Sequence, residues 1–307
     1  MDKLTGIIDE PVGCGGDDNL DIDVHARSLV RFIRDTSTPM SIGVQGEWGS
    51  GKTSLINSIY HEFSKENEYK QIWINSWEHS ILSSPEEALL KIINQIIDEI
   101  LESDANLDRT KKIKEGAEKI FKGALRLGVS AVGGASASEV AKELLHSSGP
   151  NITKLRGQLN DVAEEITSRK SNSFKKIIIY VDDLDRIEPK NAVAILELLK
   201  NIFSVPHCVF ILAIDYQVVV KGLENKFGKQ TEKNEWEFRA FFDKIIQLPF
   251  MMPMGQYNIG KYVNHLLAQV GFVDEKDRLD PHAVAEIMLR SIGSNPRSIK
   301  RLVNNVS

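Results

Sequence analysis

Residues 46 to 53 read Gly46-Glu47-Trp48-Gly49-Ser50-Gly51-Lys52-Thr53 and match the spacing G-x-x-x-x-G-K-[ST]. Glycines let the backbone turn tightly, so that successive amide N–H groups can point at a polyphosphate. An apolar run at residues 40–44 precedes this stretch, and apolar residues at helical spacing follow it at 54–60. Because the motif requires the order strand, glycine loop and helix, the stretch predicts a phosphate-binding loop.

The loop also predicts individual roles. Lys52 supplies a cation for the β- and γ-phosphates of a nucleotide, and Thr53 offers a hydroxyl to Mg²⁺. Trp48 either packs in the fold or lies at the edge of the base. We expect the nucleotide to contact the loop and the residue after it, namely Gly46, Glu47, Trp48, Gly49, Ser50, Gly51, Lys52, Thr53 and Ser54.

The composition indicates an ordinary globular chain of 307 residues with 42% hydrophobic and 26% charged residues. Its net charge of -5 argues against a protein that coats nucleic acid. Two cysteines and an N-terminus without a signal peptide favour the cytoplasm. The uncharged run between Arg126 and Glu139 is shorter than the roughly 20 residues that span a bilayer, so we expect no membrane anchor.

Further apolar runs predict the rest of the fold. The predicted strands cover residues 71–75, 176–181, 208–214 and 245–248, and helical patterns lie between them. Continuous apolar strands that alternate with helices predict a parallel sheet in a three-layer α/β/α fold. The predicted parts are residues 1–102 and 174–256 as the two halves of the core, 103–173 as a helical insertion and 257–307 as a small helical lid.

An acidic stretch, Asp182-Asp183-Leu184-Asp185-Arg186, directly follows one buried strand. Nucleotide chemistry takes place at the carboxyl ends of such strands. We therefore expect Asp182 to hold Mg²⁺ and Asp183 to orient or deprotonate the attacking water. Glu47 is a second candidate base. Asp185 and Arg186 either pair with each other or face a neighbouring subunit.

Two other positions are open to two interpretations. Asp215 either senses the γ-phosphate or caps the helix that begins at Tyr216. Asn295-Pro296 begins a helix with basic residues at 297, 300 and 301, which either presents Arg297 to the nucleotide or forms a solvated basic face. Arg239 is a weaker candidate for an arginine that acts on a neighbour's nucleotide.

Together these stretches resemble the KAP family of P-loop NTPases, relatives of the STAND and AAA+ ATPases. The resemblance covers most of the chain. It rests on six stretches: Asp9-Glu10-Pro11 with the helix at 26–29, the loop 46–55, Asn75-Ser76-Trp77-Glu78, the acidic strand end 182–186, residues 241–249, and residues 295–301.

The resemblance implies an ATP-dependent NTPase with Mg²⁺ and an association with bacterial defence against phage or with signalling scaffolds. The family often carries membrane-spanning helices where this chain has its insertion, and here no such span is expected. Guanine-specific relatives carry Asn-Lys-x-Asp, whereas residues 225–228 read Asn-Lys-Phe-Gly, which favours adenine.

We therefore expect an ATP-binding and ATP-hydrolysing switch that works as a homo-oligomer or with a protein effector encoded nearby. The alternatives are a nucleotide-gated oligomeric scaffold with little hydrolysis, a nucleic-acid-stimulated ATPase and, less favoured, a small-molecule kinase. The last residues, 302–307, end within a predicted helix, which suits a piece of a longer protein.

Overall fold

The computed structural model describes residues 6–81, 85–102, 108–116, 149–168, 173–202, 204–273 and 279–306. The chain forms two compact units. The loop unit contains Met1–Asp35, Gly46–Lys65 and Met251–Ser307, and the sheet unit contains Thr36–Gln45 and Glu66–Phe250. The predicted four-part division of the chain stays a prediction.

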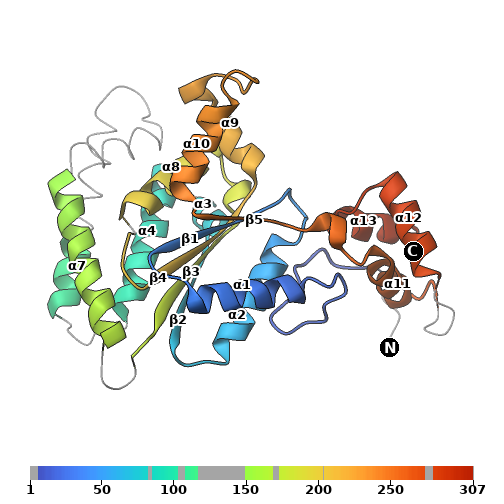
Figure 1. Cartoon of the computed structure of the whole chain (residues 1–307), viewed down its shortest axis with the longest axis horizontal. Helices are drawn as coiled ribbons and strands as arrows, with labels where there is room; N and C mark the ends of the chain where they lie inside the picture. Colours follow the sequence, from blue (N-terminus) through green and yellow to red (C-terminus); the bar gives the residue numbers. More distant parts are fainter. Residues whose placement is uncertain are drawn as a thin grey trace. The chain divides into compact units, whose positions relative to one another are not determined.

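The sheet unit is built on five strands that pair in the order β2-β3-β4-β1-β5 (Figure 1). The strands are β1 Met40–Gln45, β2 Tyr69–Asn75, β3 Lys176–Asp182, β4 Cys208–Ile214 and β5 Leu248–Met251. β2 pairs with β3, β3 with β4 and β4 with β1, each time in parallel. β3 and β4 are buried along almost their whole length, as their continuous apolar sequences predict for a parallel sheet. The predicted α/β fold class is confirmed.

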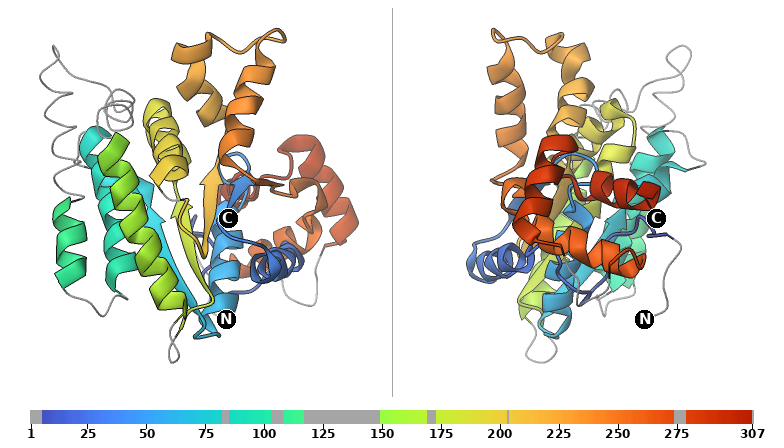
Figure 2. Two further views of the ribbon diagram at one scale, coloured as in Figure 1. Left: turned by 60° about the vertical axis from the view of Figure 1, so that its left-hand side comes forward. Right: turned by 90° about the vertical axis from the view of Figure 1, so that its right-hand side faces the viewer.

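Helices of the sheet unit cover one face of these strands. They are α3 Ser76–Ser80, α4 Pro85–Glu102, α7 Gly149–Ser168, α8 Pro189–Ile202, α9 Tyr216–Phe227 and α10 Glu235–Ile245. Alternate residues of β3, Ile177, Ile179 and Val181, share one apolar core with side chains of α4, α7, α8, α9 and α10. α9 and α10 pack side by side (Figure 2). This core fixes the strands that carry the acidic stretch.

The predicted strand at 245–248 is wrong in its position. Ile245 ends α10, where its side chain is buried with those of Phe238, Phe241 and Phe242 at helical spacing. A short apolar run does not distinguish a helix end from a strand, because both bury the same residues. The strand begins at Leu248 and contains Pro249, which an edge strand such as β5 tolerates.

The carboxyl ends of β1 and β3 lie at the same edge of the sheet, on either side of β4. Gln45, the last residue of β1, pairs with Ile214 of β4, and Val181 of β3 pairs with Leu212. Asp182 is the last residue of β3, and the phosphate loop follows Gln45 in the chain. The sheet topology therefore places the strand end that precedes the phosphate loop at the same edge as the strand end that carries Asp182.

The loop unit is helical around the phosphate loop. Its elements are α1 Asp23–Asp35, α2 Lys52–Ser64, the short turn η2 Met254–Gln256, α11 Ile259–Gln269, α12 Pro281–Ser291 and α13 Pro296–Val306. α1 packs on α2, and α11 packs on both α12 and α13. In the described residues from 257 onward the chain is helical, as the sequence predicts.

The predicted insertion is described only in part. Residues 108–116 are helical, and α7 occupies its end. The small-residue run at 126–139 lies outside the described residues. Among the helices that the structure describes, none has both the length and the apolar character needed to cross a membrane.

Candidate functional site

The phosphate loop has a backbone that only glycine adopts readily. Gly49 and Gly51 have φ of 87° and 98°, in the left-handed region that side chains disfavour. At Gly46 an added Cβ atom would lie 2.5 Å from Oγ of Ser50. The three glycines predicted from the motif are therefore required by the geometry of the loop.

Lys52 begins α2 and is buried against the loop. Its Nζ atom donates to the carbonyl oxygens of Gly46 and Glu47, at 2.9 and 3.2 Å. The ammonium group therefore lies inside the loop, and the N-terminal end of α2 adds a partial positive charge beside it. Ser50 Oγ is buried and has no hydrogen-bonding partner among the described residues. The roles predicted for Lys52 and Ser50 in binding a nucleotide stay predictions.

Thr53 and Ser54 follow Lys52 in the first turn of α2. Ser54 Oγ accepts a hydrogen bond of 3.1 Å from the backbone N–H of Val12. The roles predicted for Ser54 in nucleotide binding and for Thr53 in metal binding stay predictions.

Asn295 connects the loop to helix α13 through both ends of its amide. Its Nδ2 atom donates to Oε1 of Glu47 at 2.7 Å and to the carbonyl oxygen of Trp48 at 3.1 Å. Its Oδ1 atom accepts from the backbone N–H groups of Arg297 and Ser298, at 3.0 and 3.3 Å. Asn295 therefore caps the helix, as the sequence predicts, and also holds the loop, which local spacing did not indicate.

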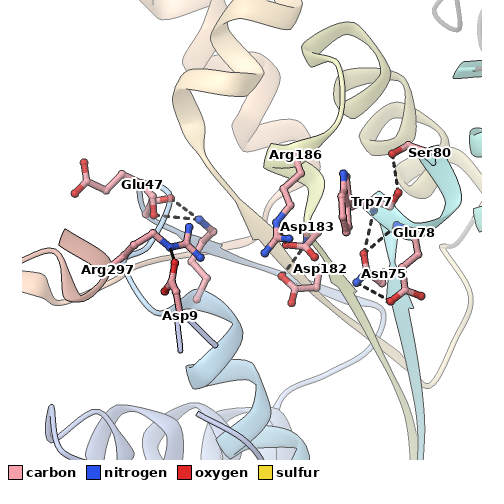
Figure 3. Close-up of polar contacts among 12 residues, drawn as sticks. Asp9, Glu47, Asn75, Trp77, Glu78, Ser80, Asp182, Asp183, Arg186 and Arg297 are labelled. Atoms are coloured by element: carbon pink, nitrogen blue, oxygen red, sulfur yellow. Dashed lines mark hydrogen bonds and ion pairs between the residues drawn. The ribbon is translucent and has the colours of Figure 1, made fainter. Parts of the chain in front are cut away.

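Arg297 packs directly on the phosphate loop. Its guanidinium group lies 4.0 Å from the ring centre of Trp48. Its Nε atom lies 2.5 Å from Oδ2 of Asp9 (Figure 3). A Cβ atom at Gly49 would come within 2.6 Å of the Cβ of Arg297. Arg297 therefore lies against the loop within the loop unit, with Trp48 packed on it, and its predicted contact with a nucleotide stays a prediction. The ion pair with Asp9 was not anticipated.

In the sheet unit, the acidic stretch forms a tight turn at the end of β3. Asp182 is 3% exposed, and its Oδ1 atom accepts a 2.8 Å hydrogen bond from the backbone N–H of Asp183. Asp183 itself has φ of 59°, a left-handed conformation that aspartate adopts more readily than most residues. The turn places two buried carboxylates next to each other.

Arg186 forms an ion pair with Asp183. Its Nε atom lies 2.7 Å from Oδ1 of Asp183, and its guanidinium group lies over the ring of Trp77 at 5.4 Å (Figure 3). Asp183 and Arg186 lie three residues apart in the same turn, and the pairing of β2 with β3 brings Trp77 next to them. The two predicted alternatives for Asp185 and Arg186, a pair with each other or a position facing a neighbouring subunit, stay predictions.

The pKa of Asp183 is raised to about 6. Burial is the main cause, and the charge of Asp182 adds to it. Arg186 and a hydrogen bond from Asn75 act in the opposite direction. Asn75 also caps α3 by accepting from the backbone N–H groups of Trp77 and Glu78. A carboxylate with a raised pKa in a buried turn is suited to exchange a proton near neutral pH.

Two weaker candidates have structural roles. Asp215 caps α9 by accepting a 2.9 Å hydrogen bond from the backbone N–H of Gln217, so the capping interpretation is confirmed. Arg239 pairs with Glu235 one turn earlier on α10. Its action on a neighbouring subunit stays a prediction.

A glycine loop between a parallel strand and a helix, with a buried lysine and an acidic strand end on the same sheet, defines the class of P-loop nucleotide-binding proteins. The family model described as the KAP family P-loop domain matches residues 22–307. The chain therefore belongs to the KAP family, and the resemblance found in the sequence is confirmed.

A distant relative is the phage T7 exclusion protein of Escherichia coli (strain K12). It is 25% identical over 244 residues, which cover 74% of this chain and 32% of that protein. The chain thus spans about a third of the length of the curated relative it matches.

Proposed function

We propose that this protein is an ATP-binding and ATP-hydrolysing switch. The observation that carries the proposal is the sheet topology, which ends β1 and β3 at one edge on either side of β4. The phosphate loop follows the first of these strands, and Asp182 ends the second. In P-loop proteins the two motifs serve one triphosphate.

The residues have separate roles in this proposal. Lys52 moves from the loop carbonyls to the β- and γ-phosphates, and the loop N–H groups hold the phosphate chain. Thr53 and Asp182 suit Mg²⁺, because a hydroxyl and a carboxylate are hard oxygen ligands and this ion needs few protein ligands beside phosphates and water. When bound, Mg²⁺ neutralises part of the phosphate charge.

Asp183 is the proposed base for the attacking water. Its raised pKa places proton exchange within reach of neutral pH, and the Arg186 side chain fixes the direction of its carboxylate. Glu47 is the second candidate, and its carboxylate accepts from Asn295. Arg297 is the proposed contact to the terminal phosphate.

The biological setting is proposed from the relative's name. A phage T7 exclusion protein acts against phage, so we propose a role in bacterial anti-phage defence or in related signalling. The proposed site of action is the cytoplasm. The proposed partners are further copies of this chain or a protein effector encoded nearby, with Arg239 as a candidate to reach a neighbour's nucleotide. Nucleic acid is a less favoured partner.

Nucleotide binding and turnover in matched variants test the proposal. Lys52→Ala should abolish ATP binding, whereas Asp183→Asn should bind ATP and lose turnover. Lys65→Ala, which removes an exposed lysine at the other end of α2, should change neither. An equal loss of binding in the first two variants would contradict the role given to Asp183.

Light scattering with ATP, ADP and a non-hydrolysable analogue distinguishes the switch from a nucleotide-gated scaffold. The switch predicts that assembly or particle size differs between the ATP and ADP states. If both states assemble identically and turnover is absent, the scaffold is correct. Turnover that rises with added DNA or RNA would favour the nucleic-acid-stimulated ATPase.

A further inference from the structure

Residues 6–16, called the strap here, run along helix α13 and are held by its side chains. Asn304 Oδ1 accepts from the backbone N–H of Ile7 at 2.7 Å, and its Nδ2 donates to the carbonyl oxygen of Ile7 at 2.8 Å. Lys300 Nζ donates to the carbonyl oxygen of Glu10 at 2.8 Å. Polar side chains of α13 at helical spacing therefore bind the main chain of the strap.

The other end of the strap contacts the helix that follows the phosphate loop. The backbone N–H of Val12 donates to Ser54 Oγ, and Asn57 Nδ2 donates to the carbonyl oxygen of Val12 at 2.8 Å. Residues 8–16 are exposed, so the strap depends on these polar contacts and not on a buried apolar surface. Segments of this kind open at a low free-energy cost.

The ion pair between Asp9 and Arg297 lies in the middle of the strap. Arg297 contacts Trp48 of the loop with one face, and Asp9 approaches its Nε atom. Yet neither Nε nor Nη1 has a hydrogen-bonding partner of good geometry in the described part of the chain, although both atoms are buried. Nε is engaged by Asp9 only through the ion pair, and the N–H groups of Nη1 are available to a second anion.

We propose that Asp9 is the residue that makes this site distinguish a nucleoside triphosphate from a diphosphate, because the terminal phosphate displaces it from Arg297 and so releases the strap. This inference rests on the proposed function, since it needs a triphosphate in the loop. It adds a specificity-determining residue and a movable segment that this function does not require.

The charges of the two competing anions support the displacement. The terminal phosphate has more negative charge than a carboxylate and presents three oxygens to the unused donors of Arg297. It also repels Asp9. Burial lowers the pKa of Lys300, which lies under the strap, and Asp9 acts in the opposite direction. The negative charge of Asp9 therefore favours the charged form of Lys300 on α13 only while the strap is in place.

Linkage gives the direction of the expected effect. If the triphosphate must displace Asp9, then removing the negative charge of Asp9 makes the triphosphate bind more tightly. The diphosphate lacks the competing group, so its affinity should stay unchanged. A residue that only stabilised the fold would change both affinities alike.

Calorimetric titration of Asp9→Asn with a non-hydrolysable ATP analogue and with ADP, both with Mg²⁺, tests this. We expect the analogue to bind about 5-fold more tightly or better, at the lower end of typical couplings, and ADP to bind within about 2-fold of the original protein. Glu10→Gln is the matched control, because Glu10 is also acidic and contacts α13 through its carbonyl oxygen. In an Arg297→Met background the effect of Asp9→Asn should vanish.

Hydrogen exchange of peptides that contain residues 6–16 gives a second measurement. Their amides should exchange faster with the analogue than with ADP in the original protein. Unchanged or weaker analogue binding in Asp9→Asn would overturn this inference, while intact binding and turnover would leave the proposed function standing. If the original protein binds neither nucleotide, both fail.

Discussion

The buried carboxylate of Asp183 allows a quantitative test of the acidic turn. In the folded protein its pKa is raised from the ordinary 3.8 to about 6, mainly by burial and then by the charge of Asp182. Replacing it with asparagine keeps the size of the side chain and suits the left-handed backbone at this position. The variant removes the ionisation and, with it, the charge that pairs with Arg186.

Linkage between protonation and folding gives the direction in which stability changes with pH. A carboxyl group whose pKa is higher in the fold than in the unfolded chain stabilises the fold while it is protonated, and this contribution is lost as the pH rises between the two values. At a pH above both pKa values, the ionised Asp183 therefore lowers the free energy of unfolding by about 3 kcal/mol, at ~1.4 kcal/mol for each unit of pKa. Part of this loss of stability occurs below about pH 4.5. The part that can be measured between about pH 4.5 and about pH 8 is about 2 kcal/mol.

The assay is urea unfolding of both proteins across this pH range, with a chelator and without nucleotide. The free energy of unfolding of Asp183→Asn minus that of the original protein should rise by about 2 kcal/mol toward high pH, mostly below pH 6. Glu188→Gln, which changes an exposed carboxylate beyond the same turn, gives the baseline. A difference that is flat, or that falls with rising pH, would refute the burial assigned to this carboxylate.

Four further substitutions test the packing around the loop and within the helices of the sheet unit. Gly49→Ala should destroy nucleotide binding and lower stability by about 1–3 kcal/mol, because its Cβ atom would meet Arg297 and its φ is positive; isothermal titration and thermal melts measure both. Asn295→Ala should lower stability by about 1 kcal/mol through loss of the α13 cap and should weaken ATP binding, and a melt without a shift would contradict the cap. Gly222→Ala should destabilise by about 1–3 kcal/mol because its Cβ atom would clash with the Pro189 carbonyl oxygen of α8, whereas Gly157→Ala, in open space on α7, should stabilise by about 0.5–1 kcal/mol.

The core of the fold could be predicted from the sequence because its signals are local. The strands at 176–181 and 208–214 are long apolar runs, and the structure places β3 and β4 there. The helix start at Asn295-Pro296 is also local, since a cap bonds to amides two and three residues ahead. The strand predicted at 245–248 was wrong in its position, because a short, mostly apolar run suits the end of a helix as well as a strand.

Only part of the candidate site could be predicted from the sequence. The residue types of the loop and of the strand end were predicted with their positions, because each lies within one short stretch. The ion pair of Arg186 with Asp183 was not predicted, although the two residues are only three positions apart. The contact of Arg186 with Trp77 was not predicted either, since it requires β2 and β3 to lie next to each other. The raised pKa of Asp183 arises from the same packing.

The sequence by itself therefore determined the class of fold, the loop that holds phosphate and the carboxylates that accompany it. Only the tertiary structure decided which polar side chains meet: Asp9 with Arg297 in an ion pair, and Asn295 with Glu47 in a hydrogen bond. The physical reason is distance along the chain. Backbone conformation and the spacing of apolar residues depend on neighbours a few residues away, whereas an ion pair between the two ends of a chain depends on how its helices pack.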